Sequence, residues 1–263
     1  MTLKGTYIKN GYVCNHKECK HICLKCGKEY TSYKLNQKYC SKSCSASVTI
    51  GLNQSMNKRI DDVSIFKNGV DNEINAYILG LIWSDGSISC DKINISMNDK
   101  ELMEQVHRLM TPNKKLYRNG KSYSVISSNE EDLKYLKSTG MTTNKSYDAR
   151  LPILNESLMP HLIRGWFDGD GCIYKSTTTN PKRGYKKTYF RVSFTTGSYQ
   201  FAEDINKFLI SVGIESNINK DCRKNVWYVQ INKIEAIIKF KNYIYKNTTI
   251  YLDRKHDKFN EIV

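Results

Sequence analysis

Two stretches of the chain have apolar residues spaced as in buried helices, and each stretch leads into an Asp–Gly pair. The first stretch is Asp71–Trp83 and the second is Pro160–Phe167. They run into two nonapeptides, Ile78–Gly86 (ILGLIWSDG) and Ile163–Gly171 (IRGWFDGDG), which align without a gap. The chain therefore contains an internal repeat in which each copy begins with a helix.

The same order of elements is expected after each nonapeptide. In the first copy, a strand is expected at residues 93–97 and a helix at 99–110. A hairpin around Asn119-Gly120 should follow, with strands at 116–117 and 123–126, and then a second helix at 130–136. In the second copy, the matching elements are expected at Cys172–Lys175, Lys187–Phe194, Gln200–Val212, Ser216–Lys220, Val226–Ile231 and Ile234–Tyr245. The expected fold class is α+β, with two pseudo-symmetric αββαββ halves.

The residues before the repeat have a different composition. Residues 1–51 hold six of the nine cysteines, and we expect them to form a small zinc-binding domain. Residues 52–70 are polar, with weak periodicity, and are expected to be a linker. The first half of the repeat is then residues 71–152, and the second half is residues 153–263.

Four of the cysteines have the spacing of a zinc site. Cys23, Cys26, Cys40 and Cys44 form the pattern C-x2-C-x13-C-x3-C, and four thiolates can close a tetrahedral Zn²⁺ site. Gly27 follows the second cysteine, where the turn needs a residue that tolerates a positive φ. The segment resembles small zinc fingers that are often appended to nucleases. Structural zinc is therefore expected here, rather than free thiols.

A second group of metal-ligating residues precedes this pattern. Cys14, His16, Cys19 and His21 could form another zinc site or supply an alternative ligand. Their spacing matches no strong zinc pattern, so spare polar residues in a basic arm are the favoured interpretation.

The charge of the chain indicates a polyanionic partner. Lys and Arg outnumber Asp and Glu by 41 to 26, which gives a net charge of +15. Residues 1–60 carry 11 basic and 2 acidic side chains, residues 61–171 carry 13 and 16, and residues 172–263 carry 17 and 8. Two basic regions favour nucleic acid over a merely solvated surface. An anionic membrane surface is disfavoured, because no basic amphipathic helix is evident.

The apolar segments are too short for a membrane protein. The longest apolar run, Tyr77–Trp83, is far below the ~20 residues that span a bilayer. The first residues lack the charged and then apolar pattern of a secretory signal. We therefore expect an intracellular protein, either cytoplasmic and encoded by a phage or bacterium, or organellar, and not a secreted one.

Small residues four positions apart mark one face of each repeated helix. These residues are Gly80 and Ser84 in the first copy, and Gly165 and Gly169 in the second. Such spacing allows two helix backbones to approach closely, so we expect the two helices to pack side by side.

Side-by-side packing would bring Asp85 and Asp170 together at the helix ends. Two nearby carboxylates repel unless a proton or cation lies between them. Mg²⁺ accepts such oxygen ligands and can serve phosphodiester hydrolysis when a phosphate is also bound. The alternative is that each Asp–Gly pair only ends its helix, with Gly86 and Gly171 in the left-handed conformation.

On these residues, the repeat resembles the LAGLIDADG homing endonucleases in their single-chain form with two motifs. The resemblance covers about residues 70–260 and implies that the acid at the eighth motif position, Asp85 or Asp170, binds the metal. The sixth position is Trp83 in one copy and Asp168 in the other, which is harmless if that position is mainly structural. Arg164 replaces a small or apolar residue at the second position of the second motif.

The resemblance also extends to the segment that closes each half. Residues Gly140–Pro152 and Tyr251–Phe259 are similar to the closing segments of the family, which place a basic residue near each metal site. Lys145 and Lys255 are the candidates, and would polarise a water network or stabilise developing phosphorane charge. The alternatives for either lysine are a phosphate contact or a solvated side chain.

The strands offer a surface for double-stranded DNA. In Lys187–Phe194, polar and apolar side chains alternate, which indicates one buried and one polar face. A sheet can enter the major groove and contact base edges with such polar residues, although an ordinary solvated face shows the same pattern. The candidate DNA-binding residues are Asn94, Ser96, Lys187, Tyr189, Arg191, Asn217, Asn219, Tyr228 and Gln230.

Together with these features, the resemblance implies a site-specific, Mg²⁺-dependent endodeoxyribonuclease that makes a staggered double-strand break. The two unequal halves predict an asymmetric DNA target contacted by one monomer, as for the homing endonucleases of mobile introns. The alternatives are a maturase that binds intron RNA and a DNA-binding regulator that does not cut. The presence of both Asp85 and Asp170 favours cleavage.

Overall fold

The computed structural model describes residues 6–9, 12–15, 19–34, 36–48, 62–142, 149–180, 184–222 and 225–262. The chain divides into two compact units, Met1–Ile60 and Asp61–Val263. Across the described ranges, the helices are all too short or too polar to cross a bilayer.

The first unit contains two hairpins. Strand β1 (Thr6–Lys9) pairs with β2 (Tyr12–Asn15), and β3 (Cys19–Ile22) pairs with β4 (Glu29–Ser32). Residues 42–48 are helical.

The second unit begins with the first half of the repeat. Its elements are α2 (Glu73–Asp85), β5 (Gly86–Ser89), β6 (Lys92–Met97), α3 (Lys100–Met110), β7 (Tyr117–Asn119), β8 (Ser122–Ser127) and α4 (Glu130–Ser138). The strands form an antiparallel sheet in the order β5-β6-β8-β7.

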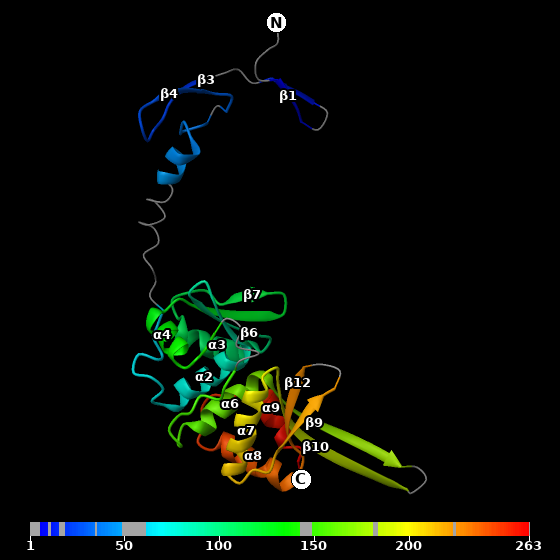
Figure 1. Cartoon of the computed structure of the whole chain (residues 1–263). Coiled ribbons are helices and arrows are strands. Elements are labelled where there is room, and N and C mark those ends of the chain that lie inside the picture. Colours follow the sequence, from blue (N-terminus) through cyan, green and yellow to red (C-terminus); the bar gives the residue numbers. More distant parts are fainter. Residues whose placement is uncertain are drawn as a thin grey trace. The chain divides into compact units, whose positions relative to one another are not determined.

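The second half repeats this architecture. Its elements are α6 (Met159–Asp170), β9 (Gly171–Asn180), β10 (Tyr185–Thr196), α7 (Tyr199–Ser211), β11 (Asn217–Asp221), β12 (Val226–Ile231), α8 (Ile234–Tyr245) and α9 (Asp253–Phe259). The sheet order β9-β10-β12-β11 matches that of the first half. The predicted pseudo-symmetric αββαββ halves are confirmed, and Figure 1 shows α2 and α6 between the two sheets.

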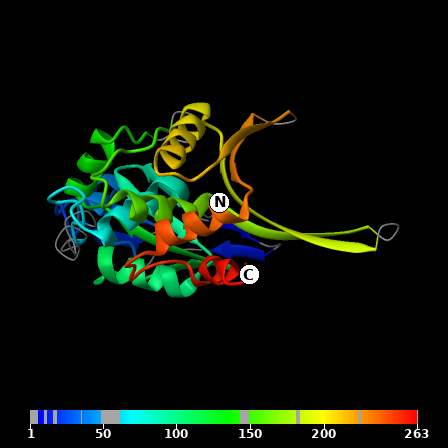
Figure 2. The same ribbon diagram turned by 90° about the horizontal axis from the view of Figure 1, so that it is seen from below.

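The β9–β10 hairpin is longer than the sequence predicted. Its strands have 10 and 12 residues and remain paired out to Asn180 and Tyr185. Figure 2 shows that this hairpin projects beyond the other elements of the second unit. Its outer part was not predicted because Ser176–Asn180 is uniformly polar and gives no alternating signal.

The expected close packing of α2 on α6 is confirmed at their glycines. A Cβ atom placed on Gly80 would lie 2.2 Å from the Leu162 carbonyl oxygen, and one placed on Gly165 would lie 2.0 Å from that of Tyr77. Backbone therefore contacts backbone at this crossing, and any side chain would force the helices apart.

The alternative interpretation of Gly86 and Gly171 as left-handed helix caps is wrong. Their φ values are −85° and −76°, which any residue can adopt. A Cβ atom at Gly86 would lie 2.5 Å from the Ile82 carbonyl oxygen, and one at Gly171 would lie 2.2 Å from the Phe167 ring. Glycine is needed here because the chain turns tightly from helix into strand.

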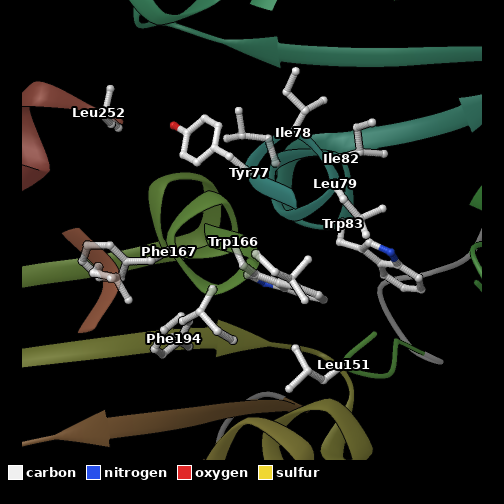
Figure 3. Packing of buried hydrophobic residues seen from close by; sticks show 14 of the residues in the cluster. Tyr77, Ile78, Leu79, Ile82, Trp83, Leu151, Trp166, Phe167, Phe194 and Leu252 are labelled. Carbon is white, nitrogen blue, oxygen red and sulfur yellow. The ribbon is translucent and has the colours of Figure 1, made fainter. Parts of the chain in front are cut away.

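The two halves share one hydrophobic core around α2 and α6. Trp83 stacks on Trp166 with ring centroids 5.9 Å apart, and Trp166 stacks on Phe201 at 3.7 Å. Figure 3 shows Trp166, Phe167 and Phe194 in the space between the helices and the second sheet, with Trp83 beside Trp166. Burial on this scale fixes the ends of α2 and α6 with respect to each other.

The predicted linker is too long at its C-terminal end. Phe66 is 2% exposed, and the buried Asp132 carboxylate accepts hydrogen bonds from the backbone N–H groups of Ile65 and Phe66 at 3.1 and 2.8 Å. Residues 62–70 therefore belong to the second unit. The sequence did not show this, because one aromatic residue in a polar stretch has no periodicity. Residues 52–61 lie outside the described residues.

Candidate active site and nucleic-acid interface

The two predicted metal-binding acids stand at the adjoining ends of the paired helices. Asp85 is the last residue of α2 and is half-buried, whereas Asp170 is the last residue of α6 and is exposed. A Cβ atom placed on Gly169 would lie 3.0 Å from Asp85 Oδ2. The structure therefore brings the Asp85 carboxylate against the residue that precedes Asp170.

The chemistry of this pair fits a hard divalent cation. Carboxylates at helix C-termini are electrostatically unfavourable, and a cation between them would offset that repulsion. Two carboxylates leave coordination positions for phosphate oxygens and water, as Mg²⁺ prefers. Asp170 also lines a cavity of about 220 Å³ together with Ser84, Thr195 and Thr196.

Lys255 lies beside this pair but is directed at the backbone. Its side chain is buried, and Nζ donates hydrogen bonds to the carbonyl oxygens of Phe167, Asp168 and Gly169 at 2.7, 2.7 and 3.0 Å, and also to that of Gly171. Burial lowers the pKa of this ammonium to about 8, although the negative charge of Asp168 acts to raise it. The contacts seen for Lys255 thus stabilise the last turn of α6. Lys145 lies outside the described residues.

Asp168, at the sixth position of the second motif, is a buried acid. Its Oδ2 accepts hydrogen bonds from the Tyr77 hydroxyl and from the Leu252 backbone N–H, both at 2.8 Å. Burial raises the pKa of this carboxyl to about 7, although the Tyr77 hydrogen bond and the Lys255 charge both act to lower it. Asp168 therefore links α2, α6 and the segment that leads into α9.

Arg164 contacts neither solvent nor the polar sheet faces. It is fully buried, and its guanidinium donates to the carbonyl oxygens of Ile250 and Ile244, each at 2.9 Å. Arg164 and Asp168 are four residues apart in a helix whose buried residues are mostly apolar. That spacing was the available signal that this helix has a buried polar stripe on one side.

Two ion pairs join the halves, and in each pair the arginine of one half's closing segment binds an aspartate of the other half. Arg254 of α9 binds Asp99 at the start of α3 through two hydrogen bonds, of 2.6 and 3.0 Å. Arg150 binds Asp204 of α7, with Nε 2.7 Å from Oδ2. Each closing segment therefore contacts the opposite half, which the sequence did not predict because the partners lie more than 50 residues apart.

The four predicted zinc ligands come together in the first unit. Their sulfur atoms all lie within 4.8 Å of one another, and the Cys26–Cys40 and Cys40–Cys44 sulfur distances are 3.6 and 3.7 Å. Tetrahedral zinc–thiolate bonds of about 2.3 Å place sulfur atoms about 3.8 Å apart, so this arrangement fits Zn²⁺. Gly27 has a φ of +70°, as the predicted turn requires. No other group of three or more metal-ligating side chains occurs within the described ranges.

The thiol pKa values also reflect crowding of the four sulfur atoms. The hydrogen bond with Cys26 and burial raise the pKa of Cys40 to about 12, whereas the Cys40 backbone N–H lowers that of Cys23 to about 6. A cation among the sulfurs would relieve this conflict. For the second predicted group, His16 lies outside the described residues, and His21 stacks on Tyr30 with centroids 5.4 Å apart.

The predicted DNA-binding residues of the second half share one face of its sheet. The pairings Ser193–Gln230, Thr195–Tyr228, Asn217–Gln230 and Asn219–Tyr228 place the candidate side chains on the face opposite Val192 and Phe194. The residues brought together there are Lys187, Tyr189, Arg191, Asn217, Asn219, Tyr228 and Gln230.

A hydrogen-bond chain orders this face. Arg191 Nε donates to Asn232 Oδ1 at 2.7 Å, and Asn232 donates to Asn217 at 3.0 Å. Asn219 donates to Gln230 at 3.1 Å. Asn232 was missed because it lies one residue beyond the alternating pattern of its strand.

The first sheet has a similar but smaller polar face. Asn94 and Ser96 lie on β6 opposite the buried residues Ile93 and Ile95. The Ser96 hydroxyl is 2.7 Å from that of Ser124 on the neighbouring strand. The two halves therefore present different polar surfaces.

Comparison with known proteins agrees with this architecture. The chain matches the family model described as a LAGLIDADG-like domain over residues 72–140 and 159–245. It is similar to the meganuclease I-SmaMI bound to uncleavable DNA, with 14% identity and a TM-score of 0.52 over 72% of this chain and 89% of that chain. It is also similar to the I-LtrWI LAGLIDADG homing endonuclease bound to target DNA, with 16% identity and a TM-score of 0.51 over 72% and 88%. At these low sequence identities, the structural likeness shows a shared fold and no more. No curated protein gave a significant match.

Proposed function

The chain belongs to the LAGLIDADG-like family, and on that premise we propose that it is a site-specific DNA endonuclease that makes a staggered double-strand break with Mg²⁺. The observation that carries the proposal is the position of Asp85 and Asp170 as the last residues of α2 and α6, with the Asp85 carboxylate against Gly169, the residue before Asp170. Polar sheet faces on both halves support DNA as the substrate, because such faces can contact base edges in the major groove.

Residues of both halves would take part in cleavage. Asp85 and Asp170 would hold the metal, and the acid of each half would serve cleavage of one strand. Bound Mg²⁺ would supply charge neutralisation and a more acidic water. Lys255 keeps the turn before Asp170 in place. Because the two polar faces differ, the target is asymmetric and one monomer contacts both half-sites.

Both alternatives to cleavage remain testable. An intron maturase would bind RNA, and a regulator would bind DNA without cutting it. Neither role requires two carboxylates at adjoining helix ends, where they destabilise the helices by a few tenths to about 1 kcal/mol each. The presence of both acids therefore favours cleavage.

The direct test is to map breaks in genomic DNA from the source of the protein. Purified protein with Mg²⁺ is expected to produce one or a few defined double-strand breaks with staggered ends, and none with EDTA. Sequencing of the ends gives the target and the stagger. Protein that binds DNA but makes no break would contradict the proposal, and binding to intron RNA would then be measured.

We also propose that Cys23, Cys26, Cys40 and Cys44 bind one structural Zn²⁺ ion. The sulfur spacing supports this, as does the exposure of most of the surrounding residues, which leaves little apolar core. A thiolate site of this kind fits a reducing compartment, so we place the protein in the cytoplasm or an organelle.

Removal of the zinc ligands should unfold the first unit alone. Cys26→Ser is expected to lower bound zinc from about one ion per chain to below about 0.2, and to make residues 1–60 sensitive to protease while residues 61–263 stay intact. Metal content by mass spectrometry and limited proteolysis measure both effects. Cys90→Ser is the control, because Cys90 is exposed in the other unit and should leave zinc unchanged. Equal zinc in all three proteins would contradict the site.

A further inference from the structure

Asp168 joins three parts of the second unit through one buried carboxylate. It is fully buried in α6, two residues before Asp170, and binds Tyr77 from α2 and Leu252 from the segment before α9. Figure 3 shows the hydroxyl end of Tyr77 directed toward Leu252. Burial of a carboxylate costs several kcal/mol, and the hydrogen bonds from Tyr77 and Leu252 are needed to offset that cost. What the acid holds in place is therefore the segment that it binds, at Leu252.

The bond to Leu252 determines where α9 begins. Leu252 occupies the cap position of α9, and its side chain makes no capping hydrogen bond. The Lys255 backbone N–H donates to the Leu252 carbonyl oxygen at 3.0 Å, which closes the first turn. Fixing Leu252 on Asp168 thus fixes the start of the turn that carries Lys255.

Lys255 in turn holds the end of α6. Its ammonium binds the backbone carbonyl oxygens of Phe167, Asp168, Gly169 and Gly171, where α6 ends and helix carbonyls need partners from outside the helix. The Phe167 carbonyl also accepts the Gly171 backbone N–H. Asp170 lies within this stretch. A carboxylate of α6 therefore positions α9, and an ammonium of α9 positions the turn of α6 that bears the metal-binding acid.

The first half lacks the acid on which this arrangement depends. Trp83 occupies the motif position that matches Asp168, and it is 3% exposed. An indole N–H can only donate a hydrogen bond, so Trp83 cannot accept one from a backbone N–H. The arrangement therefore belongs to one half of the molecule.

We propose that Asp168 is a positioning residue for the second half, which sets Lys255 and the turn bearing Asp170 and so serves cleavage of one DNA strand but not the other. The inference rests on the proposed endonuclease function, in which each half attacks one strand.

The experiment measures the cleavage of each strand separately. A duplex target carries a different fluorophore on each strand, and single-turnover rates are compared for the full-length protein and its variants. Asp168→Leu keeps the branched shape of the side chain but removes both acceptor oxygens. It is expected to slow one strand about 10- to 100-fold, the range for an ångström-scale misplacement, and the other by less than about threefold. Lys255→Gln should slow the same strand.

Two further variants separate positioning from stability. Asp168→Asn keeps an acceptor for the Leu252 N–H and is expected to restore the slowed strand to within about tenfold of wild type. Asp132→Asn is the matched control, because Asp132 is also a fully buried acid that binds backbone N–H groups. It lies in α4 of the first half, and not at the C-terminal ends of α2 and α6. Any slowing that it causes should be equal for the two strands.

Equal slowing of both strands by Asp168→Leu, unchanged rates, or no recovery in Asp168→Asn would each overturn the inference. If Asp168→Leu does not fold, Lys255→Gln decides alone, and equal effects on both strands overturn it. Wild-type protein that cuts neither strand overturns the proposed function and this inference with it. If wild-type protein cuts both strands but the variants show no strand bias, the inference alone fails.

Discussion

The double substitution Asp85→Asn with Asp170→Asn is expected to slow DNA cleavage by at least about 10³-fold, equivalent to about 4 kcal/mol of transition-state stabilisation. Both amides keep the size of the acids but remove the two negative charges that would hold Mg²⁺ at the adjoining helix ends. Affinity for the target should change by less than about tenfold, because the polar sheet faces are untouched.

The same substitution should leave the fold unharmed or slightly more stable. Each carboxylate ends a helix, where its charge opposes the helix dipole by a few tenths to about 1 kcal/mol. Loss of activity together with an unchanged or raised melting temperature would mark the acids as functional residues, since residues kept for stability behave in the opposite way.

Single-turnover cleavage, target binding and thermal unfolding measure the three effects. Asp91→Asn is a suitable control, because Asp91 is an exposed acid whose contact is an ion pair with the exposed Lys137. It should leave all three quantities near wild type. A double variant that still cuts, or whose melting temperature falls by more than a few degrees, would contradict the assignment.

The parts of the fold that follow a local period could be predicted from sequence. The apolar spacing of Asp71–Trp83 gave α2 to within two residues at either end, and Val226–Ile231 gave β12 with its observed bounds. The small residues at i and i+4 predicted the close helix pair, because a contact of backbone against backbone requires glycine at the crossing.

The parts that depend on distant partners could not be predicted. The sequence did not place Arg164 or show what Asp168 binds. Both are buried because Ile250, Ile244, Tyr77 and Leu252 supply their hydrogen bonds from other elements. Spacing alone therefore placed the paired acids and the cysteines, whereas the residues that hold the acids in place emerged only with the tertiary structure.

Replacing Gly165 with Ala is expected to destabilise the second unit by about 3 kcal/mol or more, even though Ala is the better helix former by about 1 kcal/mol. The new Cβ would lie 2.0 Å from the Tyr77 carbonyl oxygen and 3.0 Å from the Leu81 backbone nitrogen. These atoms belong to α2 itself, so a side-chain rotation cannot relieve the overlap. The helices must separate by about an ångström, which loosens the core on both sides.

Gly213→Ala provides the matched comparison. Gly213 has no atom within 4 Å of an added Cβ, but its φ of +76° makes alanine mildly strained, by about 1–2 kcal/mol. In urea unfolding, Gly165→Ala should therefore have the lower midpoint of the two, and its melting temperature should fall by roughly 6–12 °C. Cleavage should also fall, because separation of α2 from α6 moves Asp85 away from Asp170. If the two variants unfold at the same urea concentration, the helix backbones are not in direct contact, and the geometry on which the paired acids depend is wrong.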